Sequence, residues 1–147
     1  MESRIWPRRF ASGLSGVWAG GLLAIGFIAA PAAFAMLPSA QAGAVVGRMF
    51  SQEAHATLGI AVAMFLLLRS TGRAGEPVFS VDLMLALGAL FCTVAGYFAI
   101  QPMIPAARVG QGAVSFGALH AISMSFYGAK TVMVMALAWR LTRPRAS

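Results

Sequence analysis

From Leu14 to Leu37 the sequence contains no ionisable side chain. About 20 apolar residues suffice for a helix to cross the hydrocarbon core of a bilayer, so this segment predicts a membrane span. Composition agrees: 59% of the residues are hydrophobic and 10% are charged, whereas soluble domains have about 25% charged residues. A soluble fold of 147 residues could not keep that much apolar surface away from water. We therefore expect an integral membrane protein.

Three further spans follow, at about residues 43–68, 81–100 and 116–139. The apolar core of the second, Ala56–Leu68, is too short to cross a bilayer and must extend back through Gly43–Phe50. Ser80 is the predicted N-cap of the third span, and Pro102 is predicted to end it. Short connections favour antiparallel neighbours. The predicted fold class is all-α, one transmembrane domain over residues 1–147 that forms an up-down-up-down four-helix bundle.

The basic residues predict the orientation of this bundle. Eight of the eleven precede the first span, join the second to the third, or follow the fourth: Arg4, Arg8, Arg9, Arg69, Arg73, Arg140, Arg143 and Arg145. By the positive-inside rule both termini are cytoplasmic, in what we expect to be a bacterial inner membrane. The net charge of +7 thus reflects topology, and the expected partner is the bilayer and not a nucleic acid. Three tryptophans are predicted interfacial anchors: Trp6, Trp18 and Trp139.

Small residues recur at four-residue spacing on three of the spans. The stripes are Gly16–Gly20, Gly43–Gly47, and Gly88 with Cys92 and Gly96. Such stripes let helix backbones approach closely in lipid. We expect them to pack within the bundle, with a homodimer through the first span as the alternative. Cys92 is the sole cysteine, which excludes an internal disulfide.

Polar residues form a stripe on each of two spans. On the fourth span the stripe is His120, Ser123, Tyr127 and Lys130, within an arc of about 80°. On the second span it is Arg48, Ser51, Gln52 and His55, within about 100°, continued by Gly59. A charge that faces lipid costs about 2.5–3.5 kcal/mol. The two stripes are therefore expected to face each other or a shared cavity.

Depth distinguishes the candidate residues. With a rise of about 1.5 Å per residue from the cytoplasmic boundary, Lys130 lies about 14 Å deep, His55 about 21 Å and His120 about 29 Å. Lys130 is then the deepest charge and must be neutral, paired or in contact with water. Glu53 and Tyr127 are its predicted partners.

Metal handling is one functional hypothesis. His55 and His120, with Met49 and Met103 in the same outer half, supply the imidazole and thioether ligands that suit copper. Haem b between the two histidines is disfavoured, because their depths differ by about 8 Å. No cofactor is expected as the leading interpretation; the alternative is handling of a soft metal, copper above all, or another small cation through His55 and His120.

A proton or solute path through Lys130 is a second hypothesis, since an ionisable residue inside a membrane is a functional candidate by default. The leading interpretation is an accessory protein, in which the polar residues hold the bundle together or contact a larger membrane complex. Enzyme activity is not expected, because the chain lacks a nucleophile elbow, a phosphate loop and an HExxH motif. Glu53 is also the only acidic residue away from the span ends, so no pair of carboxylates is available for acid–base chemistry.

Several short segments resemble a known family. They are Trp18–Gly21, Ala30–Phe34 with Leu37, Ala42–Phe50, Gln101–Met103 with Arg108, and Phe116, Leu119, His120 and Ser123. The pattern resembles that of small four-span bacterial proteins grouped as domain of unknown function 4149, which is similar to eukaryotic transmembrane protein 205. A weaker similarity is to the membrane domain of CopD-type copper-resistance proteins, a helical bundle with histidines on its outer side.

The resemblance implies a four-helix membrane bundle and assigns no activity to the bacterial members. The eukaryotic relative is associated with resistance to platinum drugs, which favours soft-metal or export functions. The family pattern has an asparagine shortly after Ser123, where this chain has Phe126-Tyr127-Gly128. A family function that depends on that asparagine would not carry over to this chain.

Overall fold

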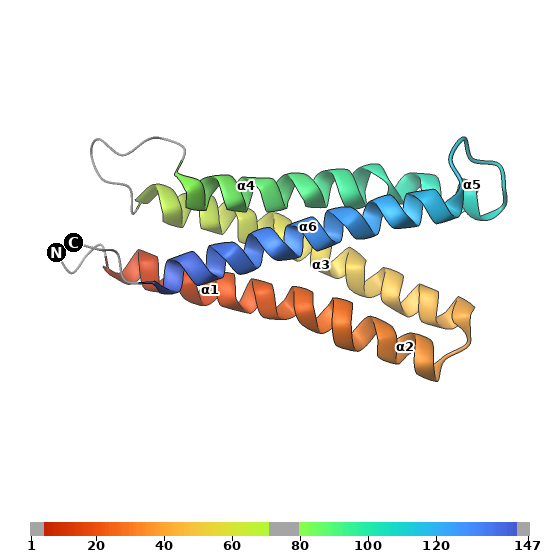
Figure 1. The fold of residues 1–147 in the computed structure, drawn as a ribbon, viewed down its shortest axis with the longest axis horizontal. Coiled ribbons are helices and arrows are strands. Elements are labelled where there is room, and N and C mark those ends of the chain that lie inside the picture. Colours follow the sequence, from red (N-terminus) through yellow and green to blue (C-terminus); the bar gives the residue numbers. More distant parts are fainter. Residues whose placement is uncertain (1–4, 71–79, 144–147) are drawn as a thin grey trace.

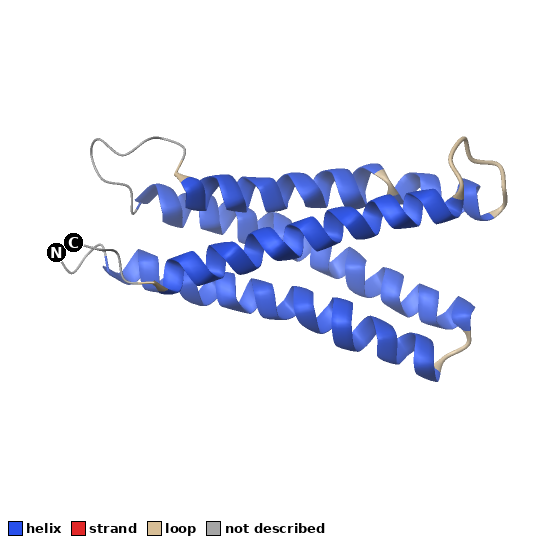
Figure 2. Ribbon diagram, in the orientation of Figure 1, coloured by secondary structure: helices blue, strands red, loops and turns tan. Residues whose placement is uncertain are grey.

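The computed structural model describes residues 5–70 and 80–143, and within these ranges every regular element is a helix (Figure 2). Four helices are long and apolar enough to cross a membrane: Trp6–Met36, Ser39–Ser70, Val81–Arg108 and Phe116–Thr142. These findings confirm the all-α fold with four candidate membrane spans. Three of the basic residues that predict the orientation, Arg4, Arg73 and Arg145, lie outside the described residues, as does most of the predicted connection from Ser70 to Phe79.

Successive long helices run in opposite directions along the molecule (Figure 1). The two ends of the described chain meet, since Nη2 of Arg8 donates a hydrogen bond to the carbonyl of Arg143 at 2.7 Å. Both ends therefore lie on the same side of the bundle. The side of the membrane to which they belong stays a prediction.

The first long helix consists of α1 (Ile5–Leu23), the π-helical segment η2 (Ala24–Ala29) and α2 (Ala30–Met36). It begins nearer the N-terminus than the apolar run alone predicts, and Pro7 stands in its first turn, where proline is compatible with a helix. Trp18 packs in the core of the bundle and is 3% exposed, whereas Trp6 and Trp139 are 74% and 63% exposed. The prediction that Trp18 is an interfacial anchor is wrong.

The second long helix, α3 (Ser39–Ser70), contains 32 residues and extends about 48 Å. It includes the segment Gly43–Phe50, so Arg48 and Glu53 belong to a continuous helix. The fourth long helix, α6 (Phe116–Thr142), begins after Ser115, whose hydroxyl accepts a hydrogen bond from the backbone amide of Ala118.

The third long helix consists of α4 (Val81–Thr93), the π-helical segment η3 (Val94–Ala99), the 3₁₀ turn η4 (Gln101–Met103) and α5 (Ile104–Arg108). Ser80 caps α4, as predicted, by accepting a hydrogen bond from the amide of Leu83 at 3.3 Å. The α4–η3 segment ends at Ala99, close to the end predicted before Pro102, and shorter helical elements then continue the course to Arg108. Pro102 stands in the first turn of η4, where its missing N–H leaves no intrahelical hydrogen bond unmade.

Packing is close in one half of the bundle and open in the other. The main core lies in the half that holds the two ends of the described chain: Ala11, Trp18, Ala19, Leu22, Met64, Ala86, Ala89, Val134, Leu137 and Leu141. At the opposite end, η2 and α2 contain no buried residue. There α2 and the start of α3 diverge from α5 and the start of α6 (Figure 1).

The glycine stripes differ in how closely atoms of other helices approach them. A Cβ on Gly88 would lie 2.8 Å from Sδ of Met133, and one on Gly96 would overlap Cβ of Phe126. The stripe on α4 and η3 is therefore used for close packing against α6, as expected. Gly16 and Gly20 of α1 are exposed and would meet nothing within 4 Å, so the packing role expected for that pair within the bundle is not observed.

Replacement of Gly96 by alanine is expected to destabilise the protein by about 1–3 kcal/mol, because the added methyl group overpacks the contact with Phe126. Thermal unfolding of the purified protein in detergent measures this effect. Gly20→Ala is the matched control: it adds a methyl group within a helix at a site with nothing within 4 Å. Equal melting temperatures for the two variants would contradict the close approach of the third and fourth long helices.

Candidate functional site

A cavity of about 190 Å³ lies between the helices toward the open half of the bundle. Its apolar walls include Phe34, Phe50 and Phe116. Its polar lining comes from Glu53, Thr93, Tyr97, Gln101, Arg108, His120, Ser123, Tyr127 and Lys130, with Cys92 beside them. Arg108, Gln101 and His120 are exposed, whereas Lys130 is buried, so the cavity runs from the splayed end of the bundle toward its core.

An ion pair forms the floor of the cavity. Nζ of Lys130 on α6 lies 2.7 Å from Oε2 of Glu53 on α3, and the two side chains are 4% and 8% exposed. The Lys130 ammonium also lies 5.0 Å from the centre of the Tyr127 ring. Both predicted partners of Lys130 are thus in contact with it. Away from water, each charge is stabilised by the other, and an unpaired one would be very unfavourable.

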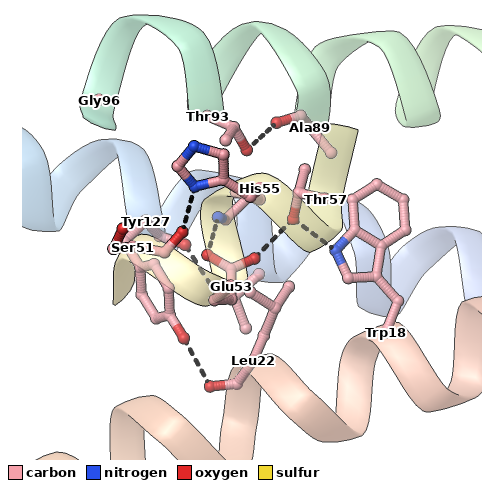
Figure 3. A network of polar contacts seen from close by, with 12 residues as sticks. Trp18, Leu22, Ser51, Glu53, His55, Thr57, Ala89, Thr93, Gly96 and Tyr127 are labelled. Atoms are coloured by element: carbon pink, nitrogen blue, oxygen red, sulfur yellow. Dashed lines mark hydrogen bonds and ion pairs between the residues drawn. The ribbon is translucent and has the colours of Figure 1, made fainter. Parts of the chain in front are cut away.

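Hydrogen bonds extend this pair to the first long helix (Figure 3). The hydroxyl of Thr57 donates to Oε1 of Glu53 at 2.6 Å and accepts from Nε1 of Trp18 at 3.2 Å. Both carboxylate oxygens of Glu53 therefore have a partner. Thr57 is fully buried, so this chain connects α1, α3 and α6 inside the bundle.

Two hydroxyl groups of α6 bind backbone carbonyls beside the π-helical segments. Tyr127 donates to the carbonyl of Leu22, just before η2, at 2.7 Å (Figure 3), and Ser123 donates to the carbonyl of Gly96, within η3, at 2.9 Å. A π turn interrupts the regular ladder of helix hydrogen bonds, and such turns are frequent at functional sites. These segments were not predicted from the sequence. Both contain a glycine followed by an aromatic residue, Gly26-Phe27 and Gly96-Tyr97, and both are followed shortly by a proline, Pro31 after η2 and Pro102 after η3.

Arg108 lies at the mouth of the cavity. Its guanidinium carbon is 5.3 Å from the centre of the Phe116 ring, and its Nη2 lies 3.9 Å from where a Cβ of Gly43 would be. The His120 ring stacks on the same Phe116 ring, with the centroids 5.9 Å apart. Within the described residues Arg108 has no carboxylate partner, because Glu53 pairs with Lys130 and Asp82 pairs with Arg140.

The stripe predicted on the second span does not face the cavity. Arg48, Gln52 and His55 are exposed and do not line it. At about 100° per residue, Glu53 lies about 160° around the helix from His55, so the two residues are on opposite faces of α3. The prediction was correct for the α6 stripe, all four residues of which line the cavity, and wrong for the α3 stripe.

The four proposed metal ligands are not brought together around the cavity. His120 lines it, whereas His55, Met49 and Met103 do not. Nδ1 of His55 donates a hydrogen bond to the carbonyl of Ser51 at 2.7 Å. The His55 ring packs edge-on against the Phe98 ring, with the two centroids 5.3 Å apart. Over residues 5–70 and 80–143, no group of three or more His, Cys, Asp or Glu side chains could hold a metal ion. Metal binding by these residues stays a prediction.

Glu53→Gln is expected to lower the stability of the protein by about 3–5 kcal/mol, because it leaves the Lys130 ammonium buried without its counter-charge. The double variant Glu53→Gln/Lys130→Met removes both charges and should be more stable than the single variant. Asp82→Asn is the control: it removes a pair whose arginine is 48% exposed, and it should change stability by less than about 1 kcal/mol. Similar melting temperatures for Glu53→Gln and Asp82→Asn would show that the Glu53 pair is not a buried one.

Comparison with known proteins gives one match. The family model described as "Domain of unknown function (DUF4149)" matches residues 13–113. No curated protein matches the chain, and no solved structure does. The matched region includes Glu53 and Arg108 and ends before α6, which provides Lys130. Since the match covers more than half of the sequence, the chain belongs to the DUF4149 family, whose function is unknown.

Proposed function

We propose that this multi-pass membrane protein admits a small polar solute, or protons, from one face of the membrane to the Glu53–Lys130 pair. The observation that carries the proposal is the cavity itself, which extends from exposed residues at the splayed end of the bundle to a buried pair of opposite charges. With both termini in the cytoplasm, as the basic residues predict, the cavity opens toward the outside of the cell.

The position of the charges supports a binding role. Ionisable residues are rare inside membrane spans and usually face a water-filled cavity or a partner. Lys130 and Glu53 each have a charged partner and also face the cavity, because they pair with each other and belong to its lining. Beyond them the core around Met64, Val134 and Leu137 is apolar and closely packed. Solutes therefore have access to the pair from one end only in this conformation.

An accessory role in a larger complex or a homodimer is the second candidate. It is favoured by the exposed face of α1, where Gly13, Gly16 and Gly20 would meet nothing within 4 Å. Glycines at this spacing let another helix approach closely in lipid. The polar outer face of α3, with Arg48 and Gln52, is a further surface for such a partner.

Soft-metal handling, which the resemblance to transmembrane protein 205 and to CopD-type domains suggested, has less support from the geometry. It depends on His55, which lies outside the cavity, acting together with His120. Elemental analysis of the purified protein beside the His55→Ala/His120→Ala double variant tests it. Copper or zinc that is near-stoichiometric in the parent and lost in the variant would support a metal site.

Reactivity of Cys92 tests access to the cavity. This sole cysteine lines the cavity and is 6% exposed. We expect the small neutral reagent methyl methanethiosulfonate to modify it in the folded protein, with mass spectrometry as the measurement. The matched control moves the thiol one helical turn to a fully buried core position, with Ala89→Cys in a Cys92→Ala background. A rate for Cys92 no higher than that of the control would contradict an accessible cavity.

Proton movement is tested in liposomes that contain the purified protein and an entrapped pH dye. Because the cavity opens at one end only, protons can cross the bundle only in a second conformation that opens the apolar core. If the protein adopts that conformation, an imposed membrane potential drives a proton flux above that of protein-free liposomes. We expect Lys130→Met to abolish this flux, because it removes one of the two titratable groups of the pair at the cavity floor. Arg140→Gln, which changes a charge outside the cavity, should leave the flux unchanged. A flux that persists in Lys130→Met would contradict a path through this residue.

A further inference from the structure

We infer that the preferred ligand of the cavity is a small organic monoanion, with its carboxylate on Arg108 and its apolar body between the aromatic walls. This inference rests on the proposed function, since it names the class of solute that the cavity takes. Its first basis is charge. Glu53 and Lys130 neutralise each other at the floor, so the positive charge of Arg108 is the uncompensated one among the acidic and basic residues of the lining. A cavity with low-dielectric walls concentrates ions of opposite charge.

The second basis is the position of Arg108. Its guanidinium carbon lies 5.3 Å from the centre of the Phe116 ring of α6, and its Nη2 lies 3.9 Å from where a Cβ of Gly43 of α3 would be. Among the described residues its N–H groups have no carboxylate partner. The planar guanidinium presents paired donors that match the two oxygens of a carboxylate. Gln101 and His120 lie in the same lining and offer further polar contacts.

The third basis is size. An apolar cavity of about 150 Å³ is known to accept benzene, so the present cavity of about 190 Å³ has room for a ring with one small substituent. Phe34, Phe50 and Tyr97 supply aromatic faces and edges along its walls. Aromatic groups favour offset or edge-on contact with another ring. Benzoate has the required charge, shape and volume and is a suitable probe.

The experiment measures the rate at which methyl methanethiosulfonate modifies Cys92 in the protein, purified in an uncharged detergent at neutral pH. Benzoate or benzamide is added over a range of concentrations. Benzamide is the matched control ligand, because it has the same ring and no charge. We expect benzoate to slow the modification in a saturable manner and benzamide to have little effect. We expect Arg108→Gln to weaken the protection by benzoate about tenfold or more, and Arg140→Gln to leave it unchanged.

The outcomes separate the inference from the proposed function. Equal protection by benzoate and benzamide, or undiminished protection in Arg108→Gln, overturns anion recognition and leaves an accessible binding cavity. If Cys92 reacts freely and neither compound slows its modification, anion recognition is overturned and the accessible cavity of the proposed function remains. A Cys92 that does not react in the folded protein overturns both. Because Arg108 is exposed, the melting temperature of Arg108→Gln should match that of the parent.

Discussion

The arrangement of the helices depends on the pairing of Glu53 with Lys130. In a hydrocarbon environment neither charge is stable alone, so α3 and α6 must be rotated until the two side chains meet. The pair joins residues 77 positions apart in the chain, and the hydrogen bonds from Thr57 and Trp18 extend the same requirement to α1. Once this rotation is set, Arg48 and His55, on the opposite face of α3, must lie on the outside of the bundle. The outward polar face of α3 is thus a consequence of the buried pair.

The same rotation places the hydroxyl groups of α6 against the backbones of the first and third long helices. Tyr127 and Ser123 are one helical turn apart and reach Leu22 and Gly96, where the regular hydrogen-bond ladder gives way to π turns. Where a π turn leaves a carbonyl without its helix donor, a hydroxyl group can replace it, and α6 donates to one carbonyl at each of these places. Gly96 has the additional property that Phe126 packs directly over it, so a side chain there would separate η3 from α6.

Much of the fold could be predicted from hydropathy, because a bilayer admits few alternatives to long apolar helices. The α6 stripe was also predictable, since His120, Ser123, Tyr127 and Lys130 are its only strongly polar face. On α3 the pattern was ambiguous, because four polar residues lie on one face and Glu53 lies on the other. Counting polar residues favoured the larger group, whereas the structure follows the single carboxylate that neutralises Lys130. The burial of Trp18 depends in the same way on a distant partner, Thr57, which sequence spacing does not reveal.

The π segments lie where the two halves of the bundle meet. On one side of η2, Leu22 is fully buried in the core, and on the other side α2 has no buried residue. η3 likewise separates the buried Cys92 and Thr93 from the exposed Gln101 at the mouth of the cavity. Each π segment is followed shortly by a proline in the same long helix, Pro31 after η2 and Pro102 after η3. π turns and prolines are both recognised causes of helix bending, so together they allow one helix to pack closely in one half and to leave space in the other. The cavity lies where this change in helix geometry occurs, and the buried ion pair marks the depth at which close packing begins.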